Sequence, residues 1–97
     1  MSRDEVLTFL KSKKQEFHTK FHVREIALFG SLARNEQHSE SDIDLIVEFE
    51  PGTDLYAMKG MIRKIVSDHF HTTVDIGRKK NLKSYYKKQI MSDAIFI

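Results

Sequence analysis

Residues 26–49 read IALFGSLARNEQHSESDIDLIVEF, and this stretch decides the fold. An apolar run ends at residues 30–31 (Gly-Ser), a polar segment follows, and a second apolar run opens with residues 41–44 (Ser-Asp-Ile-Asp). Residues that favour β-structure, bounded by turn residues, predict a strand on each side of the polar segment. The stretch therefore predicts strand, turn, loop and strand, with the first strand over residues 23–29.

The second strand, predicted over residues 41–50, carries two aspartates separated by one residue. Because successive side chains of a strand point to opposite faces, Asp42 and Asp44 are expected on the same face. The other face is expected to carry the apolar residues toward the core: Ile43, Leu45, Val47 and Phe49. Two carboxylates held about 7 Å apart at their backbones can converge on one divalent cation or on a close pair of cations.

The Gly30-Ser31 pair ends the first strand and predicts a turn into one or two helical turns over residues 31–35. Backbone amides at the start of such a helix can bind an anion. Arg34 lies three residues after Ser31 and hence on the same side of a helical turn. A plain turn explains Gly-Ser alone, but the added guanidinium favours a phosphate-binding site.

A third, short strand is predicted over residues 72–76. Val74 and Ile76 share one face of it, and Asp75 takes the other. If this strand lies beside the second one, three carboxylates meet on one sheet face. Such a set suits Mg²⁺, which prefers oxygen ligands and leaves positions open for substrate phosphates. An exposed acid on a strand remains the simpler interpretation of each aspartate taken alone.

Apolar residues at helical spacing predict helices over residues 2–20, 54–69 and 82–91. Each helix has a residue that can cap its N-terminus, and these are Ser2, Thr53 and Asn81. Residues 94–97 form a short apolar tail. The expected fold is α/β (α+β), with a small mixed sheet of about three strands packed with helices in αβαβαβα order.

The composition of the 97 residues predicts one domain over residues 1–97. Hydrophobic residues make up 40% and charged residues 31%, as in ordinary globular proteins. The absence of cysteine excludes disulfides and thiolate metal sites. No apolar run approaches the ~18 residues of a membrane span, so we expect no membrane association and a cytoplasmic location.

The net charge of +2 is unevenly distributed. Residues 36–54 contain seven acids and no Lys or Arg, whereas residues 78–88 contain six basic residues and no acid. The basic run, with Tyr85 and Tyr86 within it, is interpreted first as a solvated helix face. Docking of a partner comes second and direct nucleic-acid binding last. A zinc site at His69 and His71 is disfavoured, because the two residues straddle a helix-to-strand junction.

Taken together, Gly-Ser-x-x-Arg at residues 30–34, Ser-Asp-x-Asp at residues 41–44 and the later Asp75 are far more specific than any part. The combination resembles the nucleotidyltransferase superfamily related to DNA polymerase beta. At this length it is similar to the minimal nucleotidyltransferases, or MNT domains, which pair with HEPN proteins in prokaryotic toxin–antitoxin modules. The resemblance covers nearly the whole chain and implies the nucleotidyltransferase fold.

The resemblance also implies roles for six residues. The nucleotide triphosphate, with ATP as substrate, would be held by Gly30, Ser31 and Arg34. A two-metal Mg²⁺ site would be formed by the catalytic aspartates Asp42, Asp44 and Asp75. Asp75 is then the best candidate for contact with the attacking hydroxyl. Asn35 stands where the family commonly has glycine, and asparagine is the residue that best tolerates the left-handed backbone expected there.

The function implied is transfer of AMP from ATP to a hydroxyl, most simply a tyrosine, of a partner HEPN ribonuclease toxin. The chain would act as the antitoxin in a hetero-oligomer with that toxin, because a domain this small would take its acceptor site from the partner. One alternative is a non-catalytic antitoxin that neutralises the toxin by complex formation. Another is nucleotidyl transfer to RNA or to a small molecule such as an aminoglycoside.

Overall fold

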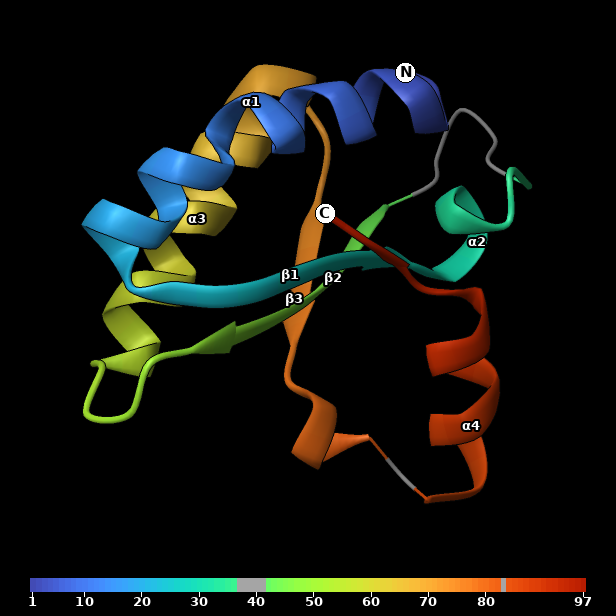
Figure 1. Cartoon of the computed structure of the whole chain (residues 1–97). Coiled ribbons are helices and arrows are strands. Elements are labelled where there is room, and N and C mark those ends of the chain that lie inside the picture. Colours follow the sequence, from blue (N-terminus) through green and yellow to red (C-terminus); the bar gives the residue numbers. More distant parts are fainter. Residues whose placement is uncertain (37–41, 83) are drawn as a thin grey trace.

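A computed structural model describes residues 1–36, 42–82 and 84–97 of the chain. In these residues the element order is α1 (Arg3–Phe21), β1 (Val23–Phe29), α2 (Gly30–Ala33), β2 (Ile43–Phe49), α3 (Leu55–Phe70), β3 (Val74–Gly77), the 3₁₀ helix η1 (Lys79–Asn81), α4 (Ser84–Asp93) and β4 (Ile95–Phe96) (Figure 1). The predicted alternation of helices and strands is confirmed. Within the described ranges, no helix is long and apolar enough to cross a membrane.

The strands form one mixed sheet in the order β3-β2-β1-β4. β1 pairs antiparallel with both β2 and β4, whereas β2 and β3 are parallel. The parallel pair needs a crossover connection, and α3 provides it. The predicted fold class is therefore confirmed, with four strands where about three were expected.

The fourth strand comes from the apolar tail. Ile95 and Phe96 pair with Leu28 and Ala27 of β1, and the backbone N–H of Ile97 donates to the carbonyl oxygen of Ile26 at 3.0 Å. The tail thus closes the free edge of β1, which would otherwise present unpaired backbone groups.

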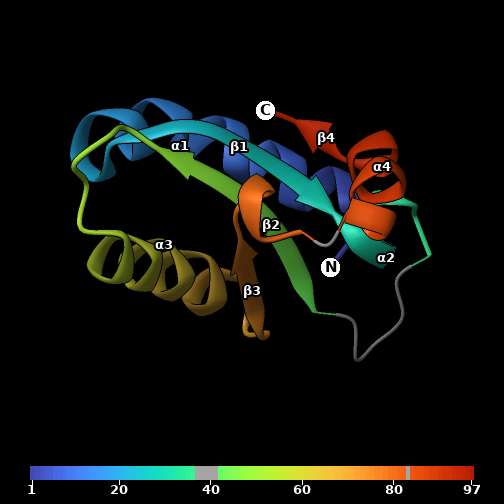
Figure 2. The same ribbon diagram turned by 90° about the horizontal axis from the view of Figure 1, so that it is seen from below.

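One face of the sheet carries the main core. Helices α1 and α3 lie together on this face, and α4 lies toward the opposite side, next to α2 (Figures 1 and 2). The buried side chains of the strands that form this core are Val23, Ile26, Leu28, Ile43, Leu45, Val47, Phe49 and Val74. The predicted inward face of β2 is confirmed, and the alternation leaves Asp44 for the other face.

The first helix begins as predicted. The side chain of Ser2 accepts a hydrogen bond from the backbone N–H of Glu5 at 3.2 Å, so Ser2 is the N-cap. Val6, Leu10 and Phe17 are buried along one stripe of α1 and fix the helix on the sheet.

The predicted cap of the next long helix is wrong by one residue. Asp54, not Thr53, is the N-cap of α3, and its carboxylate accepts from the backbone N–H of Ala57 at 3.1 Å. The hydroxyl of Thr53 instead donates to the carbonyl oxygen of Glu50 at 2.6 Å. Both residue types cap helices, and the adjacent turn decides which of them occupies the N-cap position.

The predicted cap at Asn81 is also wrong. Residues Lys79–Asn81 form η1, and α4 begins only at Ser84. The backbone N–H of Leu82 closes the 3₁₀ turn by donating to the carbonyl oxygen of Lys79 at 3.2 Å. This short turn separates β3 from the last helix, so the predicted helix over residues 82–91 shifts by two residues.

Candidate active site

Two of the predicted aspartates are direct neighbours in the sheet. Asp44 of β2 is the register partner of Asp75 of β3 in the parallel pair. Asp44 is half-buried and Asp75 is exposed. Because Ile43 and Val74 of the preceding register pair are buried in the core, the two aspartates leave the sheet on the opposite face.

The surroundings of Asp44 are electrostatically unfavourable for its charged form. Burial, and after it the charges of Asp75 and Asp42, together raise the pKa of Asp44 from 3.8 to about 6, whereas Arg34 acts in the lowering direction. Two neighbouring acids and one guanidinium therefore act on the Asp44 carboxylate. A carboxylate held under such repulsion gains stability from a bound cation.

The third predicted aspartate lies just outside the strand. β2 begins at Ile43, so the prediction that Asp42 belongs to the strand is wrong, and Asp42 is exposed in the segment that precedes it. Ser41, the predicted start of the strand, lies outside the described residues. Asp42 still contributes to the site through its charge on Asp44.

The described part of the chain contains no group of three or more His, Asp or Glu side chains gathered closely enough to hold a metal ion. The chemistry of the donors nevertheless suits Mg²⁺. This ion usually binds through one or two carboxylates, keeps several waters and uses substrate phosphates as further ligands. The mutual repulsion at Asp44 is the feature of the structure that fits a cation arriving with a nucleotide.

Gly30 lies in direct contact with the Asp44 carboxylate. Its φ is +78°, in the left-handed region, and a Cβ built at this position would collide with the Oδ2 atom of Asp44. The contact follows from the register, because Phe29 at the end of β1 pairs with Asp44. Glycine is thus required twice, by the backbone and by the close approach of the carboxylate.

Ser31 and Arg34 follow on the same short element. Ser31 is partly exposed in α2, and Arg34 ends it, with its backbone N–H donating to the carbonyl oxygen of Gly30 at 3.2 Å. The structure therefore brings Gly30, Ser31 and Arg34 together beside Asp44. This is the arrangement expected of a phosphate-binding segment next to a metal site.

The guanidinium of Arg34 already has two acidic partners. Its Nε lies 3.1 Å from Oε2 of Glu36, and its Nη1 lies 3.8 Å from Oδ2 of Asp93 at the end of α4. Neither partner was predicted. Glu36 is near in sequence and offered a local signal, whereas Asp93 is brought there only by the packing of α4 beside α2.

Asn35 adopts the predicted left-handed conformation, with φ of 60°. Its backbone N–H donates to the carbonyl oxygen of Leu32 at 3.1 Å, which ends the short helix. The substitution of the usual glycine by asparagine therefore preserves the shape of the backbone at this position.

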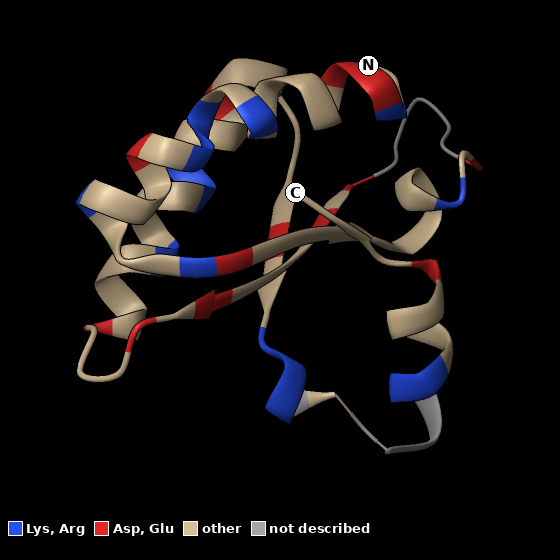
Figure 3. Cartoon of the chain, in the orientation of Figure 1, with Lys and Arg blue, Asp and Glu red and all other residues tan. Residues whose placement is uncertain are grey.

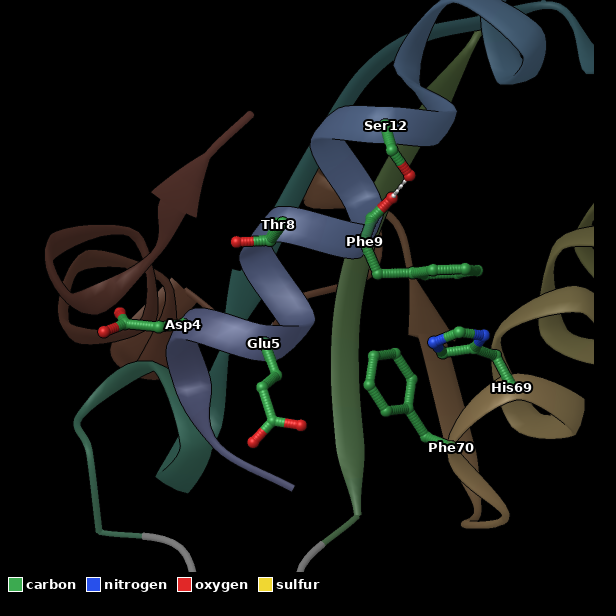
Figure 4. Close-up of a pocket in the computed structure, with 7 residues that line it drawn as sticks. All are labelled: Asp4, Glu5, Thr8, Phe9, Ser12, His69 and Phe70. Carbon is green, nitrogen blue, oxygen red and sulfur yellow. Dashed lines mark hydrogen bonds between the residues drawn. The ribbon is translucent and has the colours of Figure 1, made fainter.

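A surface hollow of about 500 Å³ lies elsewhere, between α1 and α3 (Figure 4). Phe9 and His69 stack there with ring centroids 4.0 Å apart, and Phe70 packs edge-on against Phe9 at 5.3 Å. His69 thus serves as an aromatic packing residue. The hollow is on the helical side of the sheet, away from the aspartates, and we assign it no part in the chemistry.

The chain belongs to the nucleotidyltransferase family, because the model of the nucleotidyltransferase domain matches residues 4–97. The predicted resemblance to the minimal nucleotidyltransferases and the prediction of a nucleotidyltransferase enzyme are both confirmed. A protein of Methanocaldococcus jannaschii that carries the provisional name protein adenylyltransferase MJ0126 is 37% identical over 95 residues, covering 96% of this chain and 95% of its own. Protein adenylyltransferase MntA of Thermococcus cleftensis is 29% identical over 97 residues, covering 100% and 97%.

Solved structures share the fold. A minimal nucleotidyltransferase, itself provisionally assigned, superimposes with a TM-score of 0.79 at 24% identity and covers 98% of this chain and 95% of its own. A crystal structure of a toxin–antitoxin with AMP-PNP gives a TM-score of 0.66 at 18% identity, covering 99% of this chain and 72% of its own. At these identities the likeness establishes the nucleotidyltransferase fold alone.

Proposed function

We propose that this chain transfers AMP from ATP to a hydroxyl group, most simply a tyrosine, of a HEPN-family ribonuclease toxin, and thereby acts as its antitoxin. The observation that carries the proposal is the pairing of Asp44 with Asp75 directly beside Gly30. Within a family of nucleotidyltransferases, paired carboxylates next to a glycine-serine turn suit the handling of a nucleotide phosphate and a metal ion.

The residues divide into three tasks in this proposal. Gly30, Ser31 and Arg34 bind the triphosphate, for which Arg34 must turn from Glu36 or Asp93 toward the phosphates. Asp42, Asp44 and Asp75 would hold Mg²⁺ as a two-metal site. Bound there, Mg²⁺ would supply charge withdrawal from the α-phosphate and charge stabilisation for the departing pyrophosphate.

In this proposal Asp75 meets the acceptor. It is exposed, whereas its register partner Asp44 is half-buried, so an incoming hydroxyl reaches Asp75 first. Its carboxylate accepts the hydrogen bond of that hydroxyl and orients the oxygen toward the α-phosphate. A bond then forms between this oxygen and the α-phosphorus, the bond from the α-phosphorus to the pyrophosphate oxygen breaks, and the hydroxyl proton passes to Asp75 or to solvent.

A protein acceptor is supported by the relatives. The full-length match to MntA is named a protein adenylyltransferase, and a structural neighbour is a toxin–antitoxin solved with AMP-PNP. The name of MntA supports a protein acceptor and an adenylyl donor, and the toxin–antitoxin structure supports a toxin as the partner and an adenine nucleotide as the ligand. The HEPN class of the toxin and its tyrosine are the further step that we propose.

The proposal is tested by intact mass spectrometry of the co-expressed partner toxin after incubation with ATP and Mg²⁺. The wild type, Asp44→Asn and a control, Asp68→Asn, are compared. Asp68 is exposed and pairs with the neighbouring Lys64 at 3.3 Å on α3, away from the sheet face of Asp44. We expect the toxin to gain the mass of AMP with the wild type and the control, and no gain with Asp44→Asn.

Peptide mapping of the modified toxin then identifies the acceptor residue. If the toxin gains no mass with any version and is still silenced by all three, the chain is a binding antitoxin and the proposed transfer is wrong. A mass gain on RNA or on a small molecule, with the toxin unmodified, would leave the nucleotidyltransferase but overturn the protein acceptor.

A further inference from the structure

A group of four charged side chains lies on the same sheet face as Asp44 and Asp75. We call Glu25, Glu48, Arg78 and Lys79 the charge clamp. Figure 3 shows acidic residues along the strands and basic residues where the chain leaves β3. The backbone N–H of Lys79 donates to Oε1 of Glu48 at 2.7 Å, and Nε of Arg78 lies 3.5 Å from Oε2 of the same glutamate. The ammonium of Lys79 lies 2.6 Å from Oε2 of Glu25.

Within the clamp, the Arg78–Glu48 pair is better shielded from water than a surface ion pair, whereas the side chains of Lys79 and Glu25 are 30% and 42% exposed. The side chains of Arg78 and Glu48 are 18% and 21% exposed. The Nε atom of Arg78 is buried and makes no hydrogen bond within the described part of the chain, so the Glu48 carboxylate holds it by charge. Lys79 also lies 5.1 Å from the ring centroid of Phe96 on β4. Solvent screens a shielded ion pair such as Arg78–Glu48 less than it screens an exposed pair, and the attraction between its charges is correspondingly stronger.

The clamp links β1 and β2 to the residues that follow β3, and Lys79 also contacts β4 through Phe96. Glu25 belongs to β1 and Glu48 to β2, Arg78 and Lys79 follow β3 directly, and Phe96 belongs to β4. The first two members of the basic run are therefore internal ion-pair partners. For these two residues, the interpretation as a solvated helix face is wrong.

The position of the clamp directly after β3 indicates that it fixes the end of this strand. β3 is a four-residue edge strand, and its register with β2 ends at the pair Ile46 and Gly77. The clamp begins at the next residue, Arg78, and uses Glu48 two residues beyond Ile46. At the other end, the N–H of Ile43 donates to the carbonyl oxygen of Thr73 at 3.0 Å.

Asp75 therefore lies between two fixed points of the chain: the hydrogen bond of Thr73 before β3 and the charge clamp after β3. A slip of the strand by one residue would turn Asp75 away from the face of Asp44, because side chains alternate along a strand. Backbone pairing alone specifies the register of so short a ladder poorly; the burial of Val74 restrains the start of β3, and the charge clamp adds a restraint at its end.

We infer that Glu48 is a positioning residue for the transfer reaction. By holding the backbone of Lys79 and the guanidinium of Arg78, it keeps β3 in register and Asp75 beside Asp44. Glu48 lies four residues beyond Asp44 on the same strand, and the proposed function gives it no contact with the nucleotide or the acceptor. The inference rests on the proposed function, in which Asp75 meets the acceptor hydroxyl.

The test compares Glu48→Ala with Glu48→Gln and with the control Glu50→Ala. Glutamine keeps an oxygen that accepts from the Lys79 N–H but loses the charge facing Arg78, whereas alanine loses both. Glu50 is an exposed glutamate two residues further on, and its side chain has no part in the clamp. All versions are used with the partner toxin for activity and as free protein for hydrogen exchange.

We expect Glu48→Ala to lower kcat for AMP transfer by about 100-fold, the scale of a misplacement of about 1 Å at a reacting group. The KM for ATP should change by less than about threefold. The proposed nucleotide-binding residues Gly30, Ser31 and Arg34 follow β1, which lies on the opposite side of β2 from β3. Glu48→Gln should recover most of the loss, and Glu50→Ala should match the wild type. In the Asp75→Asn background, Glu48→Ala should cause almost no further loss, since the group that it positions is absent.

Backbone hydrogen exchange supplies a readout that needs no activity. In Glu48→Ala, the amides of residues 74–77 should exchange at least about tenfold faster, with α1 unchanged. Faster exchange throughout the protein, unchanged kcat, or losses that simply add in the double variant would each overturn the inference. If the wild type transfers no AMP at all, the proposed function fails, and the localised exchange alone then decides whether the clamp fixes β3.

Discussion

Asp44 of β2 and Asp75 of β3 are direct partners in parallel register, on the sheet face opposite the core. Like charges on neighbouring strands repel each other, and here one of the two is half-buried. Burial, together with Asp75 and Asp42, accordingly raises the pKa of Asp44 to about 6. A pair of like charges that destabilises the fold is expected at a site that binds a cation, where function rather than packing determines the residues.

The first prediction follows from this raised pKa. The folded protein binds the Asp44 proton more tightly than the unfolded chain does. The pKa of Asp44 is about 6 in the folded protein, whereas an aspartate without these neighbours has a pKa of 3.8. The contribution of Asp44 to stability is therefore highest below about pH 4, falls as the pH rises through 6 and is lowest above that. Asp44→Asn should thus be about 1 kcal/mol more stable than the wild type at pH 7, after allowance for solvent screening.

Urea unfolding between pH 4 and pH 8, with EDTA present, measures this difference. The stabilisation by Asp44→Asn should vanish toward pH 4, and Asp68→Asn, at an exposed position on α3, should show no such trend. A stabilisation that is the same at every pH would contradict the raised pKa. Added Mg²⁺ should stabilise the wild type at pH 7 more than it stabilises Asp44→Asn.

The sequence predicted the parts of the molecule that local patterns determine. Alternating apolar residues correctly predicted β1 and the inward face of β2, and Ser2 correctly predicted the start of α1. β4 was missed because two residues, Ile95 and Phe96, are too few for a period of two to be seen. Asp54 was passed over because Thr53 beside it has the same capping chemistry.

In the candidate site, too, some features could be predicted from local sequence patterns and others could not. Asp44, Asp75 and Gly30 could be proposed from motif and strand alternation, and the structure places them together. The ion pairs of Arg34 with Asp93 and of Lys79 with Glu25 could not, because 59 and 54 residues separate the partners (93 − 34 and 79 − 25). Such pairs depend on how helices and strands pack, which no local pattern encodes.

A second prediction concerns the different roles proposed for the paired residues Asp44 and Asp75. Asp75→Asn should lower kcat for AMP transfer by at least about 100-fold, the usual scale for loss of a group that handles the proton of the nucleophile. Binding of the non-hydrolysable analogue AMP-PNP to the free protein should change by less than about threefold, because the proposal assigns Asp75 to the acceptor rather than to the nucleotide. Calorimetry and toxin modification measure the two quantities, and a large loss of nucleotide affinity would instead place Asp75 among the nucleotide-binding residues.

A third prediction uses two glycines that share a backbone conformation. Gly30 and Gly52 have φ of +78° and +86°, but only at Gly30 would a Cβ collide with Asp44, whereas nothing lies within 4 Å at Gly52. Gly52→Ala should cost about 1 kcal/mol from the left-handed backbone alone. Gly30→Ala should cost about 1–3 kcal/mol more from the collision, and it should abolish AMP transfer.

Chemical denaturation of both variants isolates the collision, because the backbone strain cancels between them. Transfer activity should survive in Gly52→Ala, since that glycine is in the turn at the far end of β2. Equal losses of stability at the two positions would show that the backbone of α2 moves away from Asp44 at little cost.

The last prediction concerns Asn35, which has a φ of 60° at a position where the resemblance to the nucleotidyltransferases implies glycine. If the position requires only the left-handed backbone, Asn35→Gly should change stability by less than about 0.5 kcal/mol, and Asn35→Ala should cost about 1 kcal/mol. The side chain is exposed, so neither substitution should change the Kd of AMP-PNP more than about twofold. Thermal unfolding and calorimetry check both expectations. Binding that became tenfold tighter in Asn35→Gly would mean that the asparagine side chain narrows the phosphate site, and the role of the residue would then lie in restraining activity.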